Sequence, residues 1–184
     1  MDSVFIRSFI VQAPTICGVK LRPLSCWHVL CLMQFDNAFV ASGEPQTRDL
    51  IQALLICKDG RKEHLKTYLR FSNSRLHRFL FTAKMSCYNI DNALDEFRQY
   101  FRAFSVMPRM WQSPDGKRSG ALWVFHMVAA LSMHLRTTTV DDVWDLPMCE
   151  AGCYRAVIAE SNGLHIAEGE LSELEEYERM HANG

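Results

Sequence analysis

The sequence predicts a mainly α-helical protein, a compact multi-helix bundle with a short N-terminal extended or β arm. Two observations favour this fold class. Apolar residues recur at three- and four-residue intervals along much of the chain, the spacing that places them on one side of a helix. Clusters of Ser, Asp, Asn, Gly and Pro separate these stretches, and such residues cap and end helices. The 184 residues, 48% of them hydrophobic, suffice for one domain with its own core.

We expect three parts along the chain. Residues 1–23 alternate loosely and contain two prolines and a glycine, which suits one or two short strands or an extended arm. Residues 24–163 form the predicted helical core domain. Residues 164–184 form an acidic C-terminal helix or tail.

Polar residues mark the expected helix starts in the first half of the core domain. Ser25 can cap a helix that runs to Gln34, and Thr47 can cap a second helix that is broken at Lys58-Asp59-Gly60. A long helical pattern follows, with one apolar side made of Leu65, Leu69, Leu76, Phe79 and Leu80.

An amphipathic helix is expected next, opened by Asn89 or Asp91 and ended by Pro108. Its inward side chains are Leu94, Phe97, Phe101 and Phe104. Residues 111–118 are rich in turn formers and lead into a strongly apolar helix at 121–135, which we expect to be central.

The last two helices of the core domain have clear boundary signals. Thr139 and Asp142 fit a capping box, in which the two residues cap each other's backbone N–H groups. A further helix restarts around Pro147 and stops near Asn162-Gly163.

Charge and cysteine content limit the classes of protein to which the chain can belong. The formal net charge of −1 argues against attachment to nucleic acid or an anionic membrane by overall charge. The seven cysteines are an odd number without regular spacing, which favours buried thiols in a reducing compartment. The N-terminus lacks a secretory signal, and no stretch approaches the roughly 20 apolar residues of a membrane span. We therefore expect a cytoplasmic protein that does not contact a membrane.

The cysteines and histidines allow a metal site but do not favour one. Cys26, His28 and Cys31 lie within six residues, and Cys149 and Cys153 would share a helix face. Without paired Cys-x-x-Cys motifs, we interpret these residues as core side chains. The expectation is therefore no metal.

Catalytic patterns do not favour an enzyme either. The sequence has no glycine-flanked serine, no local catalytic cysteine motif and no glycine-rich phosphate loop. His126 and His134 fall in the apolar helix, where we expect them to be packed between core and surface. We predict a protein without catalytic residues or cofactors.

Three segments are candidates for binding a partner. Between residues 58 and 84, eight Lys and Arg residues are opposed by two acidic residues, and Lys62, Lys66 and Arg70 form a helical stripe. This stripe suits phosphates or an acidic protein surface; the alternative is a solvated helix face. The other candidates are Trp111, in the polar loop, and the apolar side of the acidic segment 168–178, formed by Leu171, Leu174 and Tyr177.

Three stretches resemble known phage proteins. Residues 21–32 (LRPLSCWHVLCL) and 49–57 (DLIQALLIC) resemble the opening helices of small proteins encoded in the tail-gene clusters of phages and prophages. Residues 138–147 (TTVDDVWDLP), with the helix that reaches residues 160–163, are similar to the ending of phage tail assembly chaperones. The resemblance implies a non-enzymatic chaperone in the host cytoplasm that binds the tape measure protein during tail morphogenesis and helps tail tube proteins to gather round it.

Two other functions stay open. One is a structural component of the virion, such as a connector or tail completion protein, in which the N-terminal arm adds to a neighbouring subunit. The other is a nucleic-acid-binding regulator that uses the basic stripe or the helices on either side of Pro147. The apolar helices favour protein partners over nucleic acid, and the oligomeric state is left open.

Overall fold

Helices dominate the structure, as the sequence predicts. The computed structural model describes residues 12–41, 43–64, 87–105, 109–110, 122–135, 139–163 and 166–167. Its helices are α2 (Cys26–Gln34), α3 (Thr47–Cys57), α6 (Ile90–Ser105), α7 (Trp123–His134), α8 (Val140–Asp145) and α9 (Met148–Ser161). Its strands are β1 (Thr15–Ile16), β2 (Val19–Lys20), β3 (Arg109–Met110) and β4 (Ile166–Ala167). Residues 61–64 form a further helical turn.

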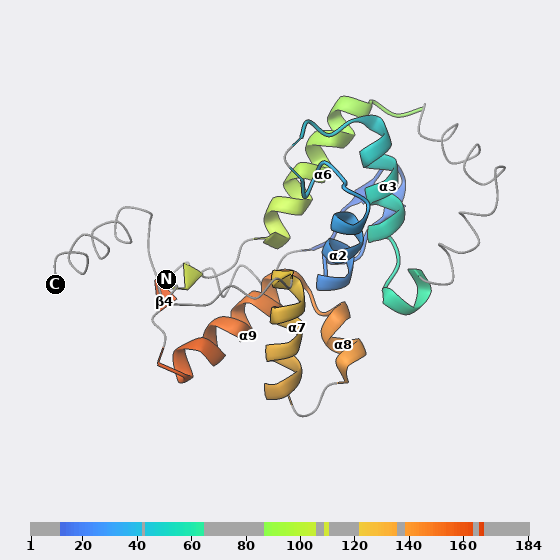
Figure 1. Cartoon of the computed structure of the whole chain (residues 1–184). Helices are drawn as coiled ribbons and strands as arrows, with labels where there is room; N and C mark the ends of the chain where they lie inside the picture. The colour runs from blue at the N-terminus through green and yellow to red at the C-terminus, as the bar shows by residue number, and fades with distance from the viewer. Residues whose placement is uncertain are drawn as a thin grey trace, which may run out of the picture.

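The helices form two groups that share one core (Figure 1). Helix α3 packs against both α2 and α6 in one group, and α7 packs against both α8 and α9 in the other. Contacts of α2 with α7 and α8, and of α6 with α9, join the two groups. No described helix is long and apolar enough to cross a membrane.

The described end of the predicted N-terminal arm is a β-hairpin. Strands β1 and β2 are antiparallel, with Ile16 opposite Val19. Cys17 and Gly18 form the turn between them with positive φ angles of 50° and 66°, which is the backbone of a two-residue hairpin turn. Ile16 and Leu21 are buried in the same core cluster as α2, so the hairpin is packed onto the helical body.

Of the four helices for which the sequence predicts a cap residue, α2, α6 and α8 begin as predicted and α3 does not. Ser25 caps α2, because its Oγ accepts the His28 N–H at 3.4 Å. At α3, however, the cap is Gln46 and Thr47 is the first helical residue. The predicted Thr47 cap is wrong because Asp49 reaches back to the Gln46 N–H, with Oδ2 and N 2.9 Å apart, and thereby sets the start one residue earlier. The predicted break after α3 is confirmed, since the next helical turn begins only at residue 61.

The later helices follow the predicted signals closely. Asn89, one of the two predicted openers, caps α6 through its Oδ1, which accepts the Asn92 N–H at 3.2 Å. The capping box of α8, made by Thr139 and Asp142, is present. Helix α9 ends at Ser161, and Gly163 follows with a φ of 84°, a left-handed conformation that glycine adopts without strain.

The amphipathic helix α6 supplies the aromatic part of the core. Phe97, Tyr100 and Phe104 are buried, with successive ring centroids 5.2 Å and 5.3 Å apart. Of the predicted inward side chains, Leu94 is also buried and Phe101 is half-buried. The Tyr100 hydroxyl donates to the backbone oxygen of Arg22 at 2.8 Å, which ties α6 to the segment that leads into α2.

Candidate functional site

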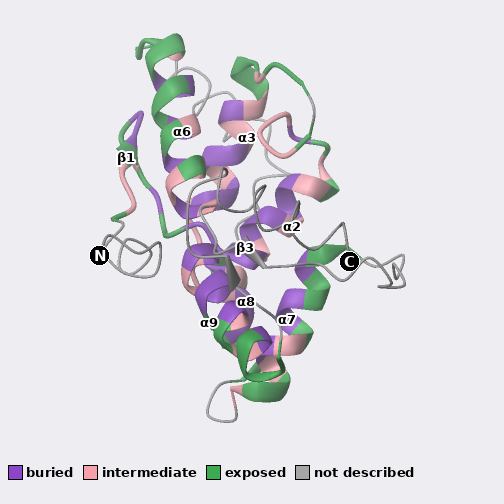
Figure 2. Ribbon diagram, turned by 90° about the vertical axis from the view of Figure 1, so that its left-hand side faces the viewer, coloured by how far each residue is buried: buried purple, intermediate pink, exposed green. Residues whose placement is uncertain are grey.

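One side of α7 presents apolar side chains to solvent, although the sequence predicts a central helix at this position. The opposite side is buried and consists of Val124, Met127, Val128 and Leu131. We call the exposed set the α7 surface; it consists of Leu122 (42% exposed), Trp123 (39%), Phe125 (45%) and Met133 (73%). In Figure 2, α7 lies at the edge of the molecule with exposed turns along its length.

The composition of the segment explains why this surface is apolar. Residues 122–135 contain no Asp, Glu, Lys or Arg, and their only strongly polar side chains are His126, Ser132 and His134, so the contrast between a buried and a solvent side is weak. Packing against α8, α9 and α2 covers one side. The other side keeps four large apolar side chains partly in water, which makes it a candidate contact surface.

The α7 surface is anchored to the body through a row of aromatic rings. Phe125 makes an edge-on contact with Trp144 of α8, with ring centroids 5.5 Å apart. Trp144 makes a similar contact with Trp27 of α2 at 6.2 Å, and Trp27 with His64 at 6.0 Å. Such edge-to-face pairs add stability beyond the burial of their area, so α7, α8 and α2 are held in a defined arrangement.

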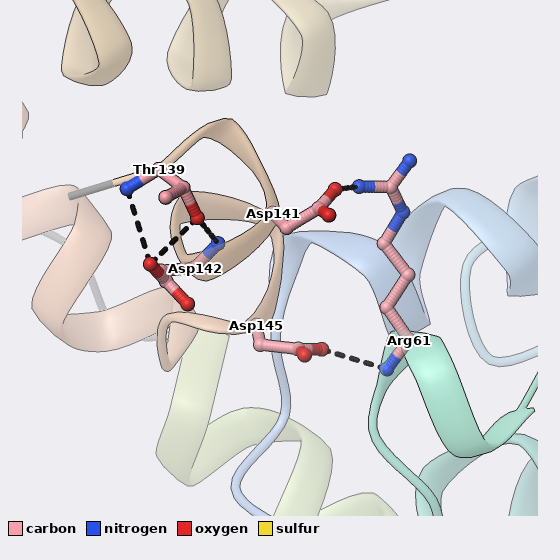
Figure 3. Close-up of polar contacts among 5 residues, drawn as sticks. All are labelled: Arg61, Thr139, Asp141, Asp142 and Asp145. Atoms are coloured by element: carbon pink, nitrogen blue, oxygen red, sulfur yellow. Dashed lines mark hydrogen bonds and ion pairs between the residues drawn. The ribbon is translucent and has the colours of Figure 1, made fainter.

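Arg61 connects this aromatic row to the acidic helix α8. Its guanidinium lies over the rings of Trp27 and Trp144, 5.4 Å and 5.9 Å from their centroids. Figure 3 shows the side chain paired with the Asp141 carboxylate, while the Arg61 backbone N–H donates to Asp145 Oδ1 at 2.8 Å. Two aspartates of α8 therefore bind the first residue of the helical turn at 61–64.

The polar groups beneath the aromatic row are arranged for structure rather than for nucleophilic chemistry. Trp27 Nε1–H donates to His64 Nδ1 at 3.2 Å, and burial lowers the pKa of His64. Cys31 Sγ lies 3.8 Å from the same nitrogen, but burial raises the pKa of this cysteine to about 12. Cys31 is thus a thiol at neutral pH, which makes it a poor nucleophile.

His28 is a second buried histidine with a structural role. Its Nδ1 accepts the Ser25 N–H at 3.1 Å, and its Nε2 lies 2.8 Å from the Asp59 backbone oxygen. Because Nδ1 accepts, Nε2 carries the proton and donates it to Asp59. The ring therefore completes the capping box of α2 and also fixes the loop after α3.

The structure places most of the cysteines as predicted. All of them are buried except Cys87, which is exposed. Cys149 and Cys153 both point into the core from α9. Within the described residues, no group of three or more His, Cys, Asp or Glu side chains is placed to hold a metal ion.

The histidines of α7 are a correction to the sequence analysis. His126 and His134 are both exposed, whereas they were expected to be packed between core and surface. The reason is that both project from the side of α7 that other helices do not cover.

The predicted partner-binding residues fall mostly outside the described residues; these are Lys66, Arg70, Trp111, Leu171, Leu174 and Tyr177. Lys62 is described and exposed. Its charge contributes to lowering the pKa of Asp142, after the larger effect of the hydrogen bonds from Thr139. The first residue of the predicted basic stripe therefore lies within electrostatic reach of the acidic helix α8.

Two open hollows lie on either side of α6. One, of about 350 Å³, separates the loop at Glu44–Gln46 from the start of α6 and contains Arg98, which is paired with Asp95. The other, of about 420 Å³, lies between the hairpin and α6, with Tyr100 and Phe104 among its lining residues. Neither hollow combines a nucleophile with a histidine base among its lining residues, so the α7 surface is the stronger candidate for function.

No protein-family model matches the chain, and comparisons with curated proteins and with solved structures also find no match.

Proposed function

We propose that the protein is a non-enzymatic binding protein that holds an apolar segment of another protein on the α7 surface. The observation that carries this proposal is the exposure of Leu122, Trp123, Phe125 and Met133 along a segment that has no Asp, Glu, Lys or Arg. Burial of such side chains in an interface contributes about 25 cal/mol for each Å² of apolar area removed from water.

The physical character of the surface suits a partner that is itself apolar. A partner side chain with a full charge would lose water on contact and find no Asp, Glu, Lys or Arg between residues 122 and 135 to compensate it. An apolar segment has no such cost. The exposed thioether of Met133 is also adaptable, because methionine adjusts to different partner shapes.

The partner that we propose is the tape measure protein of a phage or prophage tail. This identification rests on the resemblance of residues 21–32, 49–57 and 138–147 to proteins of tail-gene clusters. A tape measure protein is long and hydrophobic, so it needs a protein that covers its apolar segments until the tail tube assembles round it. The proposed role is that of a tail assembly chaperone.

Co-expression tests this proposal. The full chain is expressed with the tape measure protein of the same genome, and the soluble fraction and co-purification of that protein are measured. We expect the wild type to keep it soluble and Met133→Asp to lose most of this effect, because the carboxylate would be desolvated in the contact. Gln99→Asp, at an exposed position of α6, is the control and should behave like the wild type.

Two outcomes would contradict the proposal. One is a tape measure protein that stays insoluble and does not co-purify with the wild-type chain. The other is equal activity of Met133→Asp and the wild type, which would remove the α7 surface from the interaction. Mass spectrometry of purified particles separates the chaperone from a virion component, because only the component stays in the particle.

A further inference from the structure

We propose that His64 is an acid-sensitive latch, which holds the helical turn at residues 61–64 against α2 while its ring is neutral and releases the end of this turn when the ring takes up a proton. Residues 65–84, the rest of the basic segment, follow His64 directly. The latch therefore controls the point from which that segment leaves the fold. It is independent of the proposed function, because its contacts lie on α2 and α8 and not on the α7 surface.

The turn is held at both of its ends. At its start, the Arg61 backbone N–H donates to Asp145 Oδ1 at 2.8 Å, and the Arg61 side chain pairs with a second aspartate of α8 (Figure 3). At its end, His64 Nδ1 accepts the Trp27 Nε1–H at 3.2 Å. The His64 backbone N–H also donates to the Gly60 oxygen at 2.7 Å, which closes the turn. Helix α8 thus holds the start and α2 holds the end.

The contact with α2 requires a neutral ring. A neutral imidazole accepts at one nitrogen and donates from the other, whereas a protonated imidazole donates from both. Because His64 Nδ1 accepts from Trp27, protonation would place two N–H groups opposite each other. The contacts of Arg61 with α8 involve no histidine. They remain after protonation, so the turn is released at His64 and stays attached at Arg61.

The immediate surroundings of His64 disfavour a charged ring. His64 is only 5% exposed, and burial is the main reason why its pKa is lowered. The charge of Asp59 opposes this effect, and that of Lys58 adds to it. On α2, the Cys31 thiol lies 3.8 Å from His64 Nδ1. This thiol offers no negative charge at neutral or acid pH, because burial raises the pKa of Cys31 to about 12.

Other charged groups surround the turn. They are Arg22 before α2, Arg61, Lys62 and Glu63 in the turn itself, and Asp141 and Asp145 in α8. Both of these aspartates already bind Arg61. The buried His28 of α2 is close enough for a charge on His64 to lower its pKa, so the two rings repel each other when both are protonated. Acid therefore adds repulsion at α2 and also breaks the bond to Trp27.

The direction of the pH effect follows from these contacts. In the released turn the His64 ring is in water and has its ordinary pKa of about 6.5, whereas in the closed turn the pKa is lower. The released form takes up the proton first, so the closed form is fully favoured above about pH 6.5 and becomes less favoured as the pH falls. With a closed ring that stays neutral, the equilibrium constant for release rises about eightfold between pH 7 and about pH 5.5.

Hydrogen exchange of the full chain, followed by NMR, tests the latch. Protection of the amide of residue 64, corrected for the intrinsic rate at each pH, should fall by up to about eightfold between pH 7 and pH 5.5, relative to amides in the middle of α9. In His64→Gln, the side-chain oxygen can accept the Trp27 Nε1–H but does not titrate, so the same amide should keep its protection. His134→Gln, which removes an exposed histidine of α7, is the matched control and should behave like the wild type.

Three results would overturn the inference. The first is wild-type protection at residue 64 that is the same at both pH values, and the second is an equal loss of protection in His64→Gln. The third needs no variant: an NMR titration of the wild-type His64 ring that gives a pKa at or above the ordinary value of about 6.5.

The latch and the proposed function can fail separately, because none of these measurements involves a partner protein. Loss of the latch with a tape measure protein that stays soluble would leave the proposed function standing. A pH-dependent latch without tape measure binding would do the reverse.

Discussion

His28 links the start of α2 to the loop after α3 only while its ring is neutral. In that form Nδ1 accepts the Ser25 N–H and Nε2–H donates to the Asp59 backbone oxygen. Burial lowers the pKa of His28 from 6.5 to about 4, and the Asp59 carbonyl and the charge of Asp145 oppose this effect in part. Protonation would place a second N–H opposite the Ser25 N–H and break the capping box.

The magnitude follows from the two pKa values. Because the folded-state pKa is below the unfolded-state value, the unfolded chain takes up the proton first as the pH falls. The stabilising contribution is therefore complete above about pH 6.5 and is lost as the pH falls towards 4. At about 1.4 kcal/mol per pH unit, the fold loses about 2 kcal/mol by pH 5 and about 3 kcal/mol by pH 4 through His28 alone.

Urea unfolding at pH 7 and pH 5, followed by circular dichroism, measures this loss. His28→Gln is the informative variant, because glutamine can reach back to the Ser25 N–H but does not titrate. Between the two pH values we expect the wild type to lose about 2 kcal/mol more of its free energy of unfolding than the variant. The buried His64 is present in both proteins, so its contribution cancels in this difference except for its charge interaction with His28.

A substitution far from His28 serves as the control for the pH dependence. Gln99→Ala, at an exposed position on α6, should keep the wild-type pH dependence. The reasoning is refuted if His28→Gln loses as much stability between pH 7 and pH 5 as the wild type does.

Two further predictions concern the contacts of α8. Thr139→Ala should lower the free energy of unfolding by about 1 kcal/mol. It should also raise the pKa of Asp142 towards its ordinary value, since hydrogen bonds from Thr139 lower that pKa. An NMR titration in which the Asp142 pKa is unchanged would contradict this. Arg61→Lys keeps the positive charge but loses the planar group over Trp27 and Trp144. We expect a loss of about 1 kcal/mol and altered tryptophan fluorescence, whereas wild-type stability would show that the stacking contributes nothing.

Helix boundaries were predictable where the responsible groups lie within one turn of each other. Ser25 and His28, like Thr139 and Asp142, are three residues apart and cap each other whatever the rest of the fold does. The error at Thr47 has the same local origin. Asp49 can complete a box with Gln46, and a rule that considers only the cap residue overlooks this reciprocal bond.

The contacts between distant segments were not predictable in this way. Arg61 and Asp145 are 84 residues apart in the chain, and nothing near either residue indicates the other. The same holds for the aromatic row, whose members come from α2, α7, α8 and the turn at 61–64. Each ring by itself is compatible with a core position, and only packing determines which rings meet.

The amino-acid sequence by itself determined that this protein is mainly helical and that an apolar helix lies within residues 121–135. Only the tertiary structure decided which side of that helix faces solvent. The physical reason is that the buried side of a helix is indicated by contrast between apolar and charged residues, and α7 has no Asp, Glu, Lys or Arg to provide that contrast. Helices α2, α8 and α9 cover one side of α7, and the apolar surface that we propose as the binding site is the side they leave exposed.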